Sequence, residues 1–197
     1  MPLCYLPPQV SALRQGEILG DVYEHVPQFP PIRVEEGQPI PINSIYHEYL
    51  VVMSPDCDLE WDFKARYPDP ESQERLISLT EISKVSSIIP QVFLAEGYKI
   101  ERIVAQVARG TDIWRRIEQN QDERYHHLVA SPIGTPPIGE LPDLYIDFKK
   151  SLSIPTQSIY DGIRINGVRR LALIPEIYIH HLMHRYYGFL SRVALPD

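Results

Sequence analysis

Residues 54–62, with the sequence SPDCDLEWD, place acidic side chains directly after an apolar run. Clustered carboxylates are ligands that Mg²⁺ takes in proteins, and a carboxyl group can also act as a general acid. Asp56, Cys57 and Asp58 are therefore candidate catalytic residues, and Asp56 and Asp58 are candidate magnesium ligands. The acidic neighbours of Cys57 disfavour a thiolate nucleophile. The alternative is a small buried cysteine surrounded by solvated acids.

A second group of chemically capable residues is the histidine-rich segment HHLMH at 180–184. His180 and His184 are four residues apart, so a helix places them on one face, where both could bind zinc. This spacing supplies half of a zinc site, and the other ligands would have to come from His126, His127, Cys57 or a carboxylate. No CxxC or HExxH motif accompanies the segment. The alternative is a solvated cationic face of a helix.

Arginines and aromatic residues gather toward the end of the sequence. Arginine can bind phosphate through two parallel hydrogen bonds, and an aromatic ring can stack on an unpaired base. The same side chains would also suit the acidic surface of a protein partner. The candidate residues for binding a partner or a nucleic acid are Arg169, Arg170, His180, His181, His184, Arg185, Tyr187 and Arg192.

Residues 176–193 carry the clearest signal of secondary structure, a strongly amphipathic helix that starts after Pro175. Apolar side chains recur at the helical period and fall within an arc of about 120°, which predicts that this face packs on the domain. The apolar arc contains Ile179, Leu182, Met183, Tyr186, Phe189, Leu190 and Val193. The opposite arc contains His180, His181, His184, Arg185, Gly188, Ser191 and Arg192.

Elsewhere, short apolar runs bounded by proline and glycine predict strands. Residues 98–119 have helical spacing that Gly110 interrupts, and Thr111 can cap a new helix, so two short helices are expected there. The expected strands lie within residues 14–23, after a turn, and at 46–54, 76–80, 125–130 and 144–148. Loops are expected at 27–41, 64–74 and 132–142, whereas 86–94 and 151–170 fit no single element.

The composition is that of a folded domain, with 44% apolar and 23% charged residues. A chain of 197 residues corresponds to roughly one domain. Nineteen prolines favour short strands and ordered loops over long helices. We therefore predict a single α+β domain over residues 1–197. A small, mostly antiparallel β-barrel or sheet would occupy residues 12–95, and two middle helices and the C-terminal amphipathic helix would belong to residues 96–197.

The net charge of −7 is distributed unevenly. Residues 1–100 hold 7 Lys/Arg against 15 Asp/Glu, a balance of −8, and residues 101–197 hold 12 against 11, a balance of +1. Phosphate repels an acidic chain, which excludes indiscriminate coating of nucleic acid but leaves local binding open. With two cysteines, no apolar stretch of about 18 residues and no signal-peptide pattern, we expect a cytoplasmic protein without a membrane span.

The order Arg14-Gln-Gly-Glu-Ile, then a loop with proline and glycine, then Glu48-Tyr-Leu-Val-Val-Met-Ser resembles the opening of the MazF/PemK-like small β-barrels. The resemblance covers about 40 of the 197 residues and implies a barrel and, as in many members of that family, metal-free endoribonuclease activity on single-stranded RNA. His47-Glu48 stands where the family has Arg-Pro, and the acidic segment 56–62 would repel RNA. A looser similarity, in the Ser-x-x-Cys-Asp-Leu strand end, is to uncharacterised bacterial proteins.

The sequence thus predicts a non-catalytic binding or adaptor module of a bacterial multiprotein system, with defence and toxin-related systems among the options. Its contact surfaces would be the cationic face of the C-terminal helix and the acidic segment 56–62, which is expected to be a loop. A protein partner is expected, and nucleic acid stays open. The alternative is a nucleic-acid-processing enzyme, either a MazF-like endoribonuclease or a metal-dependent nuclease using Asp56 and Asp58. No cofactor is expected for the binding module, whereas the alternatives place Mg²⁺ at Asp56 and Asp58 or Zn²⁺ at His180 and His184.

Overall fold

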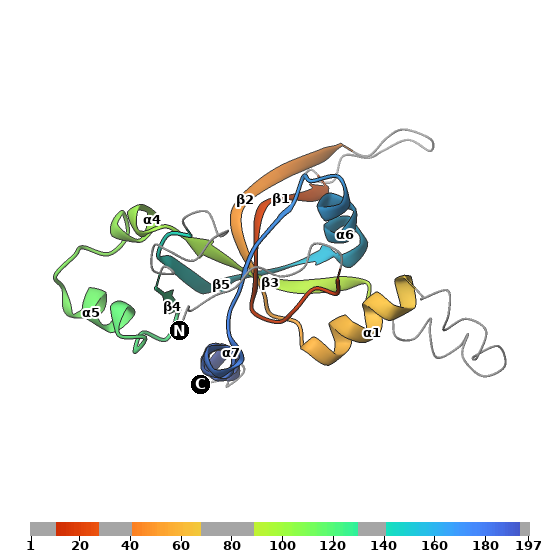
Figure 1. The fold of residues 1–197 in the computed structure, drawn as a ribbon. Helices are drawn as coiled ribbons and strands as arrows, with labels where there is room; N and C mark the ends of the chain where they lie inside the picture. Colours follow the sequence, from red (N-terminus) through yellow and green to blue (C-terminus); the bar gives the residue numbers. More distant parts are fainter. Residues whose placement is uncertain (1–10, 28–40, 68–88, 130–140, 194–197) are drawn as a thin grey trace.

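The computed structural model describes residues 11–27, 41–67, 89–129 and 141–193, and it confirms an α+β architecture (Figure 1). These residues form one six-stranded antiparallel sheet with the strand order β4-β5-β3-β2-β1-β6, together with five helices. The strands are β1 (Glu17–Pro27), β2 (Ile42–Val52), β3 (Gln91–Tyr98), β4 (Tyr125–Leu128), β5 (Leu144–Pro155) and β6 (Arg169–Leu173). The helices are α1 (Asp56–Arg66), α4 (Ile100–Val104), α5 (Asp112–Glu118), α6 (Thr156–Arg164) and α7 (Glu176–Val193).

The sheet formed by these strands is open. Strand β4 pairs only with β5, and β6 pairs only with β1, so the two edge strands of the described sheet do not meet. The sequence predicted either a mostly antiparallel sheet or a small barrel. The described strands form the antiparallel sheet, and they do not close into a barrel. The two expected parts of the chain share this sheet, because β4 and β5 of the second part lie beside β3 at one edge and β6 of the second part lies beside β1 at the other.

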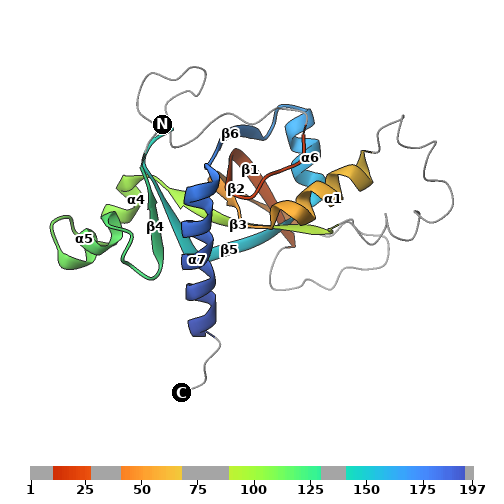
Figure 2. The same cartoon turned by 60° about the horizontal axis from the view of Figure 1, so that its bottom comes forward.

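The helices cover the sheet in three groups, each with its own buried apolar cluster. Helix α7 runs across the strands (Figure 2) and contributes Leu182 and Met183 to the cluster that contains Val51 and Ala95. Helices α1 and α6 lie at one end of the sheet, and α4 and α5 lie at the other (Figure 1). Leu50 precedes Val51 in β2, and Leu94 precedes Ala95 in β3. Because successive side chains of a strand alternate between faces, Leu50 and Leu94 lie on the face of the sheet opposite α7 and pack with α1 and α6.

Several elements agree with the expectations from the sequence. Helix α7 spans Glu176–Val193, and the two middle helices are α4 and α5. Gly110 has a φ of 78°, and the Thr111 side chain accepts a hydrogen bond of 3.2 Å from the backbone N–H of Trp114. A residue with positive φ ends the first segment and the threonine caps the next helix, as the pattern predicted.

The acidic segment 56–62 was expected to be a loop, and that expectation is wrong because these residues begin α1. Pro55 precedes the first turn, where a proline ring is favourable, and Asp56 and Asp58 lie at the positive end of the helix dipole. The helix buries only Leu59 and Asp62, so its sequence lacks the helical spacing of apolar residues that would have predicted it. The described part of the expected loop at 64–74 also continues α1 as far as Arg66.

Some expectations fall outside the described residues. The strand expected at 76–80 lies there, as do most of the loop at 27–41 and nearly all of the loop at 132–142. The segments left unassigned now have elements, because β3 begins at Gln91 and residues 151–170 hold the end of β5, α6 and the start of β6. In the described part of the chain, no helix combines the length and apolar character that crossing a membrane requires.

The turn at residues 14–17 connects four elements. Gly16 adopts a φ of 78°, which glycine tolerates without steric cost. Its N–H donates to the Val52 carbonyl at 2.8 Å and its carbonyl accepts from the Ile174 N–H at 3.1 Å. A Cβ at this position would lie 2.7 Å from Cγ1 of Ile179 on α7, so the close approach of the helix also requires glycine. The turn therefore fixes β1, β2, β6 and α7 relative to one another.

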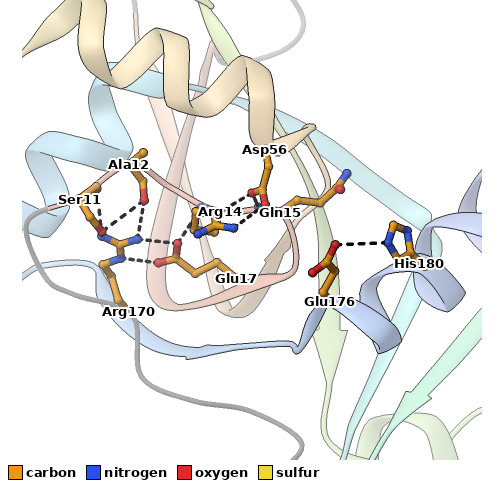
Figure 3. Close-up of polar contacts among 9 residues, drawn as sticks. All are labelled: Ser11, Ala12, Arg14, Gln15, Glu17, Asp56, Arg170, Glu176 and His180. Atoms are coloured by element: carbon orange, nitrogen blue, oxygen red, sulfur yellow. Dashed lines mark hydrogen bonds and ion pairs between the residues drawn. The ribbon is translucent and has the colours of Figure 1, made fainter.

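A fully buried ion pair holds this turn to β6 (Figure 3). Arg170 donates through Nε and Nη2 to the two carboxylate oxygens of Glu17, the latter at 2.7 Å. Its other N–H groups donate to the Ala12 carbonyl and to the carbonyl and hydroxyl oxygens of Ser11, at 2.9–3.0 Å. All five guanidinium N–H groups are thus engaged, which is the condition under which a buried charge is tolerated.

We predict that Glu17→Gln lowers the free energy of unfolding by about 3–5 kcal/mol, because it leaves the charge of Arg170 buried and unpaired. The control is Arg169→Gln, which removes the exposed pair with Asp21 and should cost less than about 1 kcal/mol. Urea unfolding at neutral pH measures both. The double variant Glu17→Gln/Arg170→Gln, without a buried charge, should recover part of the loss. Equal effects of Glu17→Gln and Arg169→Gln would contradict the assignment.

Candidate functional site

Helix α7 has one side on the sheet and one side in solvent. The backbone N–H groups of Tyr178 and Ile179 donate to the Pro175 carbonyl at 2.9 and 3.1 Å, so the helix starts directly after the proline. Four members of the expected apolar arc are buried and Phe189 is half-buried, but Leu190 is 42% exposed, contrary to the expectation. Of the residues expected on the outer side, His180, His181, His184, Gly188, Ser191 and Arg192 are exposed, and Tyr187 is exposed as well.

Arg185 differs from the rest of that set because it holds the helix to the sheet. Its guanidinium donates to the Asn120 side chain at 2.8 Å and to His126 Nδ1 at 2.9 Å. It also donates to the backbone carbonyls of Asp122 and Tyr125. Because His126 accepts this hydrogen bond, its ring is neutral, and burial together with the charge of Arg185 lowers the pKa of His126 to about 3. Arg185 is a structural anchor in this position.

The other three arginines expected on a contact surface are also engaged by the chain itself. Arg170 is 3% exposed and bound to Glu17, so a partner cannot reach it in this structure. Arg169 pairs with Asp21, and Arg192 at the end of α7 pairs with Glu123. The outer side of α7 is consequently a histidine, tyrosine and aliphatic surface, and the arginines that were to make it cationic are engaged elsewhere.

The acidic residues at the start of α1 are engaged to different degrees. The Asp56 carboxylate accepts from Arg14 at 2.8 and 3.0 Å and from the backbone N–H of Gln15 at 2.6 Å. Cys57 is exposed, and its thiol lies 3.5 Å from a carboxylate oxygen of Asp58. Since Gln15 contacts Asp56 and the adjoining Gly16 packs on α7, the two expected contact surfaces lie on either side of one turn (Figure 3).

The proposed metal ligands do not converge. Among residues 11–27, 41–67, 89–129 and 141–193, no group of three or more His, Cys, Asp or Glu side chains is arranged to hold a metal ion. His180 is exposed, and its Nε2 lies 3.7 Å from the Oε1 of Glu176, one helical turn away. His126, offered as a further zinc ligand, accepts a hydrogen bond from Arg185 and is packed against the ring of His181 at 5.4 Å between centroids. The geometry therefore provides half-sites only.

The structure also contains a polar network that the sequence did not indicate. His47 on β2 is buried, with Nδ1 2.6 Å from a carboxylate oxygen of Glu96 and Nε2 3.2 Å from one of Glu24. Carboxylates accept hydrogen bonds, so both ring nitrogens donate and the imidazole is protonated. The hydroxyl of Tyr98 donates to the second oxygen of Glu96. Three strands contribute to the network, which no local sequence pattern could reveal.

Electrostatics in this network follow from the hydrogen bonds. The hydrogen bond to Glu96 raises the pKa of His47, which burial alone would lower. Burial raises the pKa of Glu96, but hydrogen bonds from His47 and Tyr98 outweigh it and hold the pKa below its usual range. Burial and the neighbouring carboxylate raise the pKa of Tyr98. A ring held as a cation between two carboxylates cannot serve as a general base, so the network joins strands and does not resemble a catalytic dyad.

We predict that His47→Gln destabilises the protein at about pH 6 by on the order of 2 kcal/mol and much less at about pH 9. The folded-state pKa of His47 lies above the unfolded value, so its contribution is complete below the unfolded pKa and is lost as the pH rises through the folded pKa. Urea unfolding at both pH values measures the difference. His25→Gln, at an exposed side chain near the end of β1, is the control and should change the free energy of unfolding little. A constant effect across pH would refute the protonated state.

Gly188 occupies the outer side of α7 inside an 18-residue helix, and no atom lies within 4 Å of the Cβ it lacks. We predict that Gly188→Ala raises the free energy of unfolding by about 0.5–1 kcal/mol, because glycine is a poor helix former. Thermal and urea unfolding measure the change. Gly162→Ala is the contrasting variant: its Cβ would meet Val168 Cγ2 at 2.5 Å, so it should destabilise. A loss of stability in Gly188→Ala would show a close neighbour on that side.

No family model, curated protein or solved structure matches this chain. The resemblance to MazF/PemK-like barrels therefore stays a prediction.

Proposed function

We propose that the chain is a non-catalytic protein-binding module of the adaptor type and that it binds its partner through the outer surface of α7. We define this surface by Ile177, His180, His181, His184, Tyr187 and Gly188. The observation that carries the proposal is the exposure of large apolar side chains on a helix whose other side is firmly packed: Ile177 is 74% and Tyr187 52% exposed. Exposed apolar side chains grouped on one element mark interaction surfaces.

The state of the arginines favours a protein over a nucleic acid as the partner. Nucleic-acid binding relies on arginines and lysines that neutralise phosphates. Arg170 is buried, Arg185 is bound to four acceptors of the chain, and Arg169 and Arg192 are paired with carboxylates. The surface that remains offers imidazole hydrogen-bond donors and acceptors beside apolar side chains. This chemistry fits a partner surface that combines apolar residues with carboxylates.

The second contact surface, expected at the acidic segment, is reduced to the exposed start of α1. Asp62 is buried and binds Arg66 and the Ile89 N–H, and Asp56 is bound to Arg14 and Gln15. We therefore place the main contact on α7. The alternative of a nucleic-acid-processing enzyme stays a prediction, and no specific contact of Asp56, Cys57 or Asp58 favours it.

Site-specific photo-crosslinking in the native cells tests the proposal. Benzoylphenylalanine replacing Tyr187 should give a discrete adduct with one protein, because its side chain lies on the contact surface. Benzoylphenylalanine replacing Phe93, an aromatic residue of similar exposure on β3, is the matched control and should not give that adduct. Arg185 is unsuitable for such a test, because its replacement would release α7 from Asn120 and His126.

Competition distinguishes specific binding from chance encounter. Excess wild-type chain should suppress the Tyr187 adduct, and a chain with Ile177→Asp should not, although it should fold normally because Ile177 makes little contact with the rest of the protein. Circular dichroism checks the fold of the competitor. An adduct that disappears on nuclease treatment, or no adduct at all, would overturn the proposal.

A further inference from the structure

One edge of strand β1 is paired with a neighbouring strand over only part of its length. On one side it pairs with β2 along its whole length, from Ile18 opposite Val51 to Pro27 opposite Ile42. On the other side it pairs with β6 only from Glu17 to Gly20. Among the described residues, no strand forms backbone pairs with this side of β1 from Asp21 onward. The backbone N–H and C=O groups that point away from β2 there form an open strand edge.

The structure marks the point where the covered edge ends. Asp21 has a φ of 60°, a conformation that few residues other than glycine adopt, and its carboxylate binds both Arg169 of β6 and the Tyr46 hydroxyl, the latter at 2.7 Å. The contact holds the first residue of β6 beside Gly20, and no described strand covers the rest of this side of β1. The open edge, defined as residues 22–27, therefore starts from a fixed point and is continuous with the sheet.

Side chains on the two faces of this open edge differ. Tyr23 stands opposite Tyr46, with ring centroids 5.2 Å apart, and these rings are 54% and 50% exposed. On the other face the Glu24 carboxylate, which accepts from His47, lies between Val22 and Val26 along the strand. Val22 is buried in the core, so a strand laid beside β1 would meet aromatic rings on one face and the Glu24 carboxylate beside Val26 on the other.

From this edge we propose that β1 binds an extended peptide of a partner protein by strand addition, and that the peptide carries apolar and basic side chains in alternation. Main-chain hydrogen bonds to the open edge would supply affinity, and the alternating side chains would supply specificity. A basic residue would lie beside Glu24, and apolar residues would pack on Tyr23. The balance of −8 in residues 1–100 also attracts a basic peptide.

A second copy of the chain fits this edge less well. In a symmetric antiparallel pair of two β1 edges, Glu24 lies opposite or diagonally beside its own copy, and such like-charge pairs are destabilising. Pro27 ends the edge with a residue that lacks an N–H donor. Charges and prolines at strand edges are devices that oppose edge-to-edge association between identical chains. This inference uses a surface separate from α7 and goes beyond the proposed function.

The probe is a short, capped, fluorescein-labelled peptide of alternating valine and lysine, with binding measured by fluorescence anisotropy against the full chain. Binding is expected, with clear loss for two control peptides. One replaces lysine by glutamate and tests the charge, and the other is N-methylated at alternate residues and cannot form the main-chain hydrogen bonds. Tyr23→Ser should weaken binding about tenfold. Phe93→Ser, at an aromatic residue of similar exposure on β3, should not.

Amide hydrogen exchange locates the bound peptide. The peptide should slow exchange in residues 22–26 and leave α7 unchanged, and this readout remains informative if Tyr23→Ser weakens the hairpin itself. Equal binding of the N-methylated peptide, protection confined to other elements, or association of the chain with itself through residues 22–27 would each overturn the proposal. None of these results bears on photo-crosslinking at Tyr187, so the two proposals can fail separately.

Discussion

The rest of the structure depends on the buried pair of Glu17 and Arg170. The pair ties residues 11–17 to β6, and the adjoining Gly16 binds the backbone of Val52 and Ile174 and receives Ile179 of α7. Since a buried charge without its partner is strongly unfavourable, the pair stabilises the arrangement of this part of the chain in which both charges are satisfied. That arrangement sets where β1 begins, where α7 crosses the sheet and where α1 starts.

Paired charges inside the protein also explain its surface. The second half of the chain has a slight excess of basic residues, but the structure uses several of them to connect elements. Arg124 holds the buried Asp147 through two hydrogen bonds of 2.6 and 2.8 Å, and Arg185 holds α7 to the end of the sheet. Arginine suits this task because its rigid fork satisfies several acceptors at once. A count of basic residues therefore overstates the positive charge available to a partner.

The elements with a strong local signal could be predicted from the sequence, and those defined by distant contacts could not. The period of α7 and the Thr111 cap lie within single segments, whereas α1 buries only Leu59 and Asp62 and so lacks a period. Arg169 and Arg170 are adjacent in β6, yet one is exposed and the other buried. Only the pairing of β6 with β1 decides which of them faces the core. The His47 network depends on three strands in the same way.

Two surfaces of different character follow from this arrangement. The outer surface of α7 offers side chains on a helix that is anchored by Arg185 and by apolar packing, so a partner bound there would be selected by its shape and chemistry. The open edge of β1 offers the main chain, which any extended segment can pair with, and its selectivity must come from Tyr23 and Glu24. Both surfaces start from the turn that Glu17 and Arg170 hold in place, because Ile179 packs on Gly16 and β1 begins at Glu17. If the module binds one partner through α7 and another by strand addition to β1, this turn would hold the two binding surfaces in a fixed position relative to each other, as an adaptor requires.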